Sequence, residues 1–155
     1  MSDDDIRIVL EQEGPYAFKV NFEGTALEAL HTDEPAPLGG GAGPGPSSML
    51  LTAIANCLGS SLVFALHKFK NQPAPIRAEI VGRKARNAEG RLRIPHADVT
   101  IHLGDKAADL EHFDRVLAQF EQFCVVTQSV REGISVDVKI VDADGAVHVP
   151  ATPVG

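Results

Sequence analysis

Residues 46–70 read PSSMLLTAIANCLGSSLVFALHKFK, and this stretch decides the fold. Its composition predicts one long helix that is apolar almost all the way round. Pro46 suits the first position of a helix, and Ser47 and Ser48 are typical of a first turn. A helix that lacks a polar face is normally buried. We therefore predict a central helix against which the rest of the chain packs.

Four polar residues interrupt this apolar run, namely Thr52, Asn56, Ser60 and Ser61. The uninterrupted apolar segments are too short to predict a membrane span. The net charge of −7 and the pI near 5.3 argue against nucleic acid or an anionic membrane as a partner. The acidic residues 1–8 lack the basic and apolar regions of a signal peptide. We expect a soluble, cytoplasmic protein.

The length of 155 residues is typical of a single domain with its own core, so we predict one domain over residues 1–155. Residues 142–155 are rich in Asp, Gly and Pro and are expected to form a loose tail. Two cysteines are too few for a disulfide framework, which fits a reducing compartment.

Strands are predicted on both sides of the central helix, because apolar and polar residues alternate there. The predicted strands cover residues 6–10, 16–22, 26–30, 76–86, 91–103 and 134–140. Helical spacing predicts two further helices, over residues 105–123 and 124–133. Asp105 suits the N-cap of the first, and Gly133 suits the C-cap of the second. A Gly- and Pro-rich loop over residues 33–46 precedes the central helix. This order predicts an α+β fold with antiparallel pairing.

The two cysteines are the candidate chemical groups. Cys57 lies in the middle of the central helix, where a buried structural cysteine and a reactive one are both possible. Cys124 opens a predicted helix, and the amides at a helix start favour a thiolate. A buried structural cysteine and a reactive one are both possible at Cys124 as well. If the fold brings the two sulfurs together, one can be oxidised to a sulfenic acid and the other can condense with it to a disulfide.

Two separated motifs carry a resemblance to a known family. The first has Asp33-Glu34-Pro35, then Gly39-Gly40 and Gly45-Pro46-Ser47, and runs into LLTAIANC at 50–57. The second reads CVVTQSV at 124–130 and is followed by Gly133 and SVDV at 135–138. Both motifs, in this order of elements, resemble the OsmC/Ohr family of osmotically induced and organic hydroperoxide resistance proteins. The resemblance covers the chain to about residue 141.

The resemblance implies antiparallel sheets packed around a central buried helix in an intertwined homodimer. It implies a thiol-dependent peroxidase that reduces organic hydroperoxides with the help of a dithiol reductant and no bound cofactor. Cys57 would be the peroxidatic residue, Cys124 the resolving one, and a Cys57–Cys124 disulfide would form in the cycle.

The sequence departs from the family pattern at one charged position. The family has a glutamate just after the loop proline, which with an arginine holds the peroxidatic thiolate, and this chain has Ser47 and Ser48 there. A serine hydroxyl can still bond a thiolate, but more weakly than a charge does. The candidate arginines are Arg7, Arg77, Arg83 and Arg86. The departure supports an alternative function, a non-catalytic module that binds a small hydrophobic molecule.

Other kinds of site are disfavoured. The histidines are scattered and form no HExxH motif, so no metal site is predicted. The segment Gly45–Met49 does not have the G-x-S-x-G pattern of a serine hydrolase, and no strand is predicted directly before it.

Overall fold

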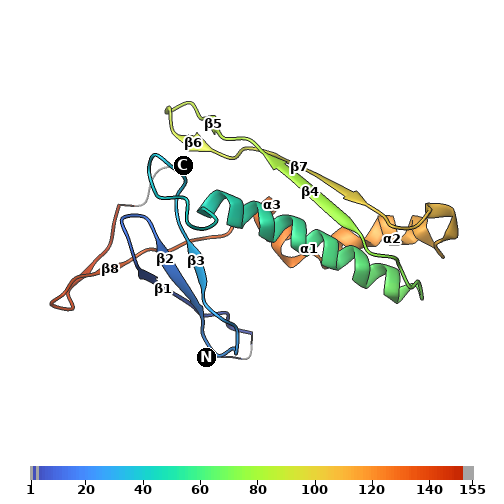
Figure 1. Ribbon diagram of the computed structural model, residues 1–155, viewed down its shortest axis with the longest axis horizontal. Helices are drawn as coiled ribbons and strands as arrows, with labels where there is room; N and C mark the ends of the chain where they lie inside the picture. Colours follow the sequence, from blue (N-terminus) through green and yellow to red (C-terminus); the bar gives the residue numbers. More distant parts are fainter. Residues whose placement is uncertain (1, 3, 152–155) are drawn as a thin grey trace.

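In the computed structural model, which describes residue 2 and residues 4–151, the long helix α1 runs from Pro46 to Lys68. The proline stands in its first turn, as the sequence predicts. Lys70, two residues beyond the helix, has a left-handed backbone with φ of 64° and turns the chain away. Residues 77–82, 97–102 and 113–132, which follow α1 in the sequence, pack along it, as Figure 1 shows.

The N-terminal sheet consists of β1 (Ile8–Gln12), β2 (Phe18–Phe22) and β3 (Leu30–Thr32) in the antiparallel order β1-β2-β3. The predicted third strand over residues 26–30 is wrong, because β3 begins only at Leu30. Thr25 explains the difference: its hydroxyl donates to the carbonyl of Phe22 and accepts the amide of Leu27. These bonds hold the segment in a turn.

The predicted long hairpin after the central helix is present. Strand β4 (Arg77–Gly82) pairs with β7 (Ala97–His102), and β5 (Ala85–Arg86) pairs with β6 (Leu92–Arg93) at the far tip. The pairing breaks around Pro95, which has no amide to donate to a neighbouring strand.

The predicted helix over residues 105–123 is divided into three pieces: η1 (Ala107–Asp109), α2 (Phe113–Gln119) and η2 (Phe120–Phe123). Asp105 is not the N-cap of a long helix. Its carboxylate instead accepts the backbone amide of Ala74 at 2.7 Å and ties this segment to the loop after α1. His112, with φ of 52°, immediately precedes α2.

Two apolar clusters form the core along one side of α1. The first is built from Leu62, Ala65 and Leu66 of α1 with Val116 of α2. The second contains Ile54 and Leu58 of α1 together with Cys124. Leu66 and Val116 are fully buried, and burying such a side chain stabilises the fold by roughly 1.5–3 kcal/mol.

Helix α3 (Val125–Glu132) ends at Gly133, whose φ of 76° confirms the predicted C-cap. The predicted strand over residues 134–140 is wrong over most of its length. Only β8 (Ile140–Val141) is paired, with β9 (Val147–His148), because no other strand of the chain lies within pairing distance of the preceding residues that the structure describes.

The turn and the second strand of the β8–β9 hairpin lie in the segment expected to be a loose tail. The carboxylate of Asp142 accepts the amides of Asp144 and Ala146 at 3.0 Å each, and Gly145 adopts φ of 83° in the turn. Residues 152–155 of that expected tail lie outside the described residues.

The fold is α+β with small antiparallel sheets, as predicted. Helix α1 alone has the length and composition of a membrane span among the described residues, but its buried residues pack on β4, η2, α2 and α3, which fits a core helix. Two large apolar side chains of α1 remain exposed: Leu50 is 42% exposed and Phe64 is 56% exposed.

Candidate functional site

The two cysteines, distant in the sequence, come together in the second apolar cluster. Cys57 lies in the middle of α1, and Cys124 is the N-cap residue of α3. Both thiols are free, and Cys57 packs against the cluster that contains Cys124. Cys57 is half-buried, whereas Cys124 is fully buried. The packing of α3 across α1 therefore creates a thiol pair with one accessible and one enclosed sulfur.

Thr127, in the first turn of α3, contacts the buried sulfur of Cys124 through two of its groups. Its Oγ1 lies 3.0 Å from the Sγ of Cys124, and its backbone amide donates to the same sulfur at 3.4 Å. Thr127 is itself buried, with 6% of its surface exposed. The N-cap position of Cys124 thus points its sulfur at the amide that the first turn leaves free.

The environment of Cys124 acts on its acidity in two opposite ways. Burial raises the pKa of this thiol, and hydrogen bonds from Cys57, Thr127 and Ser61 lower it. The hydrogen bonds prevail, so the pKa of Cys124 lies below its ordinary value of 9.0. This agrees in direction with the expectation that a helix start favours a thiolate at Cys124.

Sequence reasoning missed Ser61 and Thr127. Ser61 lies one helical turn after Cys57 on α1, and it is buried. Thr127 stands three residues after Cys124, which is the spacing between an N-cap residue and the amide that bonds to it. The spacing of four residues from Cys57 to Ser61 and of three residues from Cys124 to Thr127 could have indicated both residues. Only the packing of α3 across α1 brings both side chains to the sulfur of Cys124.

Ser47 and Ser48 do not replace the missing glutamate within this chain. Ser47 precedes Cys57 by ten residues on one helix, which corresponds to about 15 Å along the axis. A hydroxyl at that distance cannot hydrogen-bond the thiol of its own chain. Within a single chain, neither of these serines can therefore bond the Cys57 sulfur.

The candidate arginines have other contacts or exposed positions. The guanidinium of Arg77 pairs with Glu79 on the exposed face of β4. Arg86 donates to the carbonyl of Gly90 in the hairpin tip. Arg7 and Arg83 are exposed. The bonds that lower the pKa of Cys124 come from uncharged groups.

The Gly-rich loop before α1 is organised by a buried carboxylate. Asp33 accepts the amide of Gly40 at 3.0 Å and that of Ala42 at 3.2 Å, and only 6% of its surface is exposed. A Cβ on Gly43 would lie 2.2 Å from the carbonyl oxygen of His31, so that only glycine fits. These contacts of Asp33 and Gly43 therefore hold the loop closed and fix the start of α1.

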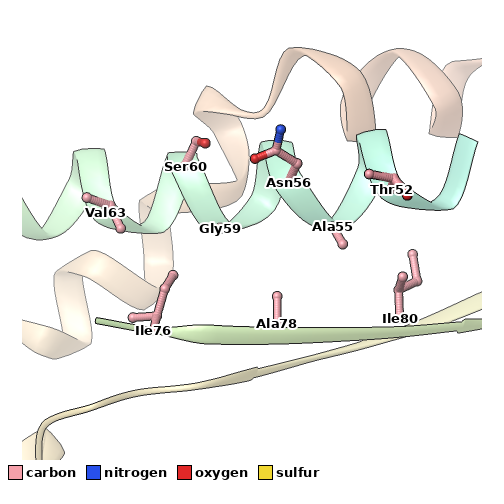
Figure 2. Close-up of a pocket in the computed structure, with 9 residues that line it drawn as sticks. All are labelled: Thr52, Ala55, Asn56, Gly59, Ser60, Val63, Ile76, Ala78 and Ile80. Atoms are coloured by element: carbon pink, nitrogen blue, oxygen red, sulfur yellow. The ribbon is translucent and has the colours of Figure 1, made fainter. Parts of the chain in front are cut away.

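A groove of about 670 Å³ runs between α1 and β4. Ala55 and Val63 of α1 face Ile76 and Ala78 across it, whereas Asn56 points away from the strand (Figure 2). Cys57 is not among the residues that line this groove, because it projects from the side of the helix that faces α3. The groove is therefore separate from the thiol pair.

A second cavity, of about 550 Å³, lies beside Thr127, and its lining residues do not include either cysteine. Its wall includes Thr127, which is hydrogen-bonded to Cys124. Much of the remaining wall is apolar and comes from α1, β7 and α3, including Leu50, Leu51, Ile54, Leu58, Val99 and Val130. One end is polar: Arg131 and Glu121 form an ion pair at 2.7 Å there. The cavity thus combines apolar side chains with polar groups, of which Thr127 is bonded to the sulfur of Cys124.

No group of three or more His, Cys, Asp or Glu side chains that could hold a metal ion exists within residue 2 and residues 4–151. Several histidines instead pair singly with carboxylates, as His31 does with Glu13 at 2.7 Å and His148 with Asp142 at 2.8 Å.

Comparison with known proteins assigns the family. A family profile described as OsmC-like protein matches residues 39–139, which include both cysteines. The chain belongs to this family of OsmC/Ohr proteins. In a search of curated protein sequences, none matched this chain.

Solved structures share the fold at low sequence identity. An OsmC-like protein of unknown function from Vibrio cholerae has a TM-score of 0.65 and 13% identity, over 83% of this chain and 94% of that one. An organic hydroperoxide resistance protein OsmC from Legionella pneumophila has a TM-score of 0.64 and 14% identity, over 84% and 92%. The organic hydroperoxide resistance protein OhrB of Bacillus subtilis has a TM-score of 0.61 and 13% identity, over 84% and 93%.

Proposed function

We propose that this protein is a thiol-dependent peroxidase that reduces organic hydroperoxides. Cys57 is the peroxidatic residue, Cys124 is the resolving residue, and a dithiol reductant returns their disulfide to two thiols. The family membership and the neighbours named as organic hydroperoxide resistance proteins support this activity. The enzyme needs no bound cofactor, because the two sulfurs exchange the electrons themselves.

One observation carries the proposal: two cysteines far apart in the sequence lie together in one apolar cluster, where the side chain of Cys57 lowers the pKa of the Cys124 thiol. The difference in burial supports these roles, since a peroxide can approach the half-buried Cys57 more readily than the enclosed Cys124.

The second cavity supports an organic rather than an inorganic peroxide. Its apolar side chains, among them Leu50, Leu58 and Val99, can pack against a hydrocarbon group, and Thr127 in its wall is bonded to the sulfur of Cys124. Burying a hydrocarbon group there contributes roughly 25 cal/mol per Å² of apolar surface. Hydrogen peroxide gains nothing from this wall, so we expect the enzyme to prefer alkyl and aryl hydroperoxides.

We also propose that the active form is a homodimer. Large apolar side chains are exposed on α1 and on the small N-terminal sheet, among them Leu10, Leu50 and Phe64. A three-stranded sheet needs a covered apolar face, and the described contacts supply little cover for β1–β3. A second copy of the chain is the partner that the family membership supports.

The activity is tested by the consumption of cumene hydroperoxide or tert-butyl hydroperoxide with a dithiol reductant. We expect the wild-type protein to turn over and Cys57→Ser to be inactive. Hydrogen peroxide is the comparison substrate and should react more slowly. Wild-type consumption no faster than that of Cys57→Ser would refute the peroxidase function.

A further inference from the structure

The tip of the β4–β7 hairpin concentrates positive charge in an otherwise acidic chain. Residues 83–93 read RKARNAEGRLR and carry five basic side chains against one acidic one, whereas the whole chain has a net charge of −7. Strands β5 and β6 form a two-stranded ribbon within this segment, the basic hairpin end (Figure 1). Its basic side chains are all exposed, namely Arg83, Lys84, Arg86, Arg91 and Arg93. The segment therefore presents a surface of one sign to the solvent.

Carboxylates of the chain do not neutralise this charge. Within residue 2 and residues 4–151, none of the five side chains forms an ion pair with an acidic residue, in contrast to Arg77, which is paired with Glu79. The guanidinium of Arg86 donates instead to the carbonyl of Gly90 at 2.6 Å. A bond to a neutral carbonyl leaves the positive charge uncompensated.

Protection of a strand edge does not explain the sign of the charge. Charged side chains on an exposed strand hinder its pairing with other chains. Acidic residues would serve this purpose equally well, and the chain has more of them, 21 against 14 Lys and Arg residues. An excess of basic residues at one end of such a chain instead indicates a partner of opposite charge.

The basic hairpin end lies next to the cavity beside Thr127. Lys84 and Arg93 line a smaller cavity of about 360 Å³ together with Leu50 of α1. This smaller cavity shares Leu50 and Ile94 with the second cavity, whose wall contains Thr127, the residue bonded to the buried sulfur. A partner bound at the basic hairpin end is thus adjacent to the cavity that leads toward the cysteines.

We propose that the basic hairpin end is the docking surface for an acidic protein that carries the dithiol which reduces the oxidised enzyme. This inference rests on the proposed peroxidase function, in which each turnover takes two electrons from outside the chain. The first thiolate of the partner attacks one sulfur of the Cys57–Cys124 disulfide and forms a mixed disulfide, and the other sulfur leaves as a thiolate. The second thiolate of the partner breaks the mixed disulfide. The partner leaves as a disulfide, and the enzyme regains two thiols with the two protons that the partner lost.

An acidic protein fits this surface better than a nucleic acid does. Residues 83–93 contain no aromatic side chain on which a base could stack. A long polyanion would extend beyond the hairpin end over a chain of net negative charge, which repels it. A compact acidic surface can face these cations alone, and the attraction directs it to the cavity.

The test compares two synthetic dithiol peptides as reductants of the full-length protein. Both contain two cysteines, which are flanked by glutamates in one peptide and by glutamines in the other. Consumption of cumene hydroperoxide gives kcat/KM for each peptide. We expect the glutamate peptide to be about tenfold more effective at low salt and the ratio of the two values to approach one in about 0.5 M NaCl. A ratio near one at low salt overturns the inference.

Charge reversal locates the docking surface. Lys84→Glu with Arg93→Glu should lower the ratio at least about fivefold at low salt. The matched control is Lys106→Glu with Arg115→Glu, two exposed cations near α2, which lies at the far end of α1 from β5 and β6 (Figure 1). This control should keep the wild-type ratio. The glutamine peptide, measured with each variant, corrects for any loss of folding or activity. Equal ratios in the two double variants would show general charge attraction and would contradict a docking surface.

Further outcomes separate the other occupants of this surface. Tighter binding of duplex DNA than of the glutamate peptide in fluorescence anisotropy would contradict an acidic protein partner. A change in the sedimenting mass of Lys84→Glu with Arg93→Glu would make the hairpin end a contact between copies of the chain. A wild type that consumes no cumene hydroperoxide with dithiothreitol removes the peroxidase function as well. Turnover with dithiothreitol but no preference between the peptides removes this inference alone.

Discussion

Thr127 holds the sulfur of Cys124 through two of its own groups, the hydroxyl at 3.0 Å and the backbone amide at 3.4 Å. This contact fixes the first turn of α3 to the core, because Cys124 is fully buried beside Ile54 and Leu58. It also stabilises a thiolate in an otherwise apolar cluster. The same contact therefore affects stability and chemistry.

The contact between Thr127 and Cys124 predicts that the stability of the folded protein depends on pH. The pKa of Cys124 is lowered in the folded protein, so that between this lowered value and about 9 the unfolded chain binds more protons than the folded one. The contribution of this thiol to the free energy of unfolding is fully present above the unfolded pKa and is lost as the pH falls through the folded pKa. Urea unfolding under reducing conditions should show stability from this source rising with pH through that window.

The matched control for this titration is Cys124→Ser, which has no group that ionises in the same range. The difference in unfolding free energy between wild type and this variant should grow with pH up to about 9. A difference that stays constant across the range would show that the thiol does not ionise more easily in the folded state.

The loop before α1 should depend on one carboxylate. Asp33→Ala removes the acceptor of two amide hydrogen bonds from Gly40 and Ala42 and leaves both amides without their partner. We expect the free energy of unfolding to fall by about 2–4 kcal/mol, because bonds to a buried charge are stronger than neutral ones. Thermal and urea unfolding measure this loss.

Asp144→Ala is the control for that substitution, because Asp144 is exposed in the β8–β9 turn. It should change the unfolding free energy by no more than about 0.5 kcal/mol. A small effect of Asp33→Ala, similar to that of the control, would mean that the amides find water or other partners and that the carboxylate does not close the loop.

The segment after α3 should mediate dimer formation. Ile134, Val136 and Val138 alternate with polar residues and are 66%, 75% and 56% exposed in the single chain. Such a pattern suits a strand that pairs with a second copy. The double variant Val136→Asp with Val138→Asp should convert the dimer to a monomer in sedimentation velocity.

The wild-type protein should sediment at twice the mass of the 16.5 kDa chain. Ser135→Asp, on the polar side of the same segment, should leave the dimer intact. A wild type that sediments as a monomer, or a double variant that stays dimeric, would contradict a dimer built through this segment.

Local patterns determined much of the fold from the sequence alone. The period of the apolar residues and Pro46 gave the extent of α1, and the observed helix ends within two residues of the predicted one. Gly133 gave the end of α3 because few other residues adopt its left-handed backbone. Strand alternation gave the β4–β7 hairpin. These signals are reliable because each depends on neighbours along the chain.

Tertiary structure decided the rest, because it depends on partners that are distant in the sequence. Asp105 has the residue type of an N-cap, yet its carboxylate bonds to Ala74 instead. The pattern at 134–138 is that of a strand, but a strand needs an edge to pair with. The sequence named both cysteines as candidates, and the crossing of α3 over α1 made them a pair and placed Ser61 and Thr127 beside the buried sulfur. Helical and strand periods depend on consecutive residues of the sequence. A hydrogen bond between two helices, in contrast, forms only when the packing of the helices brings donor and acceptor together.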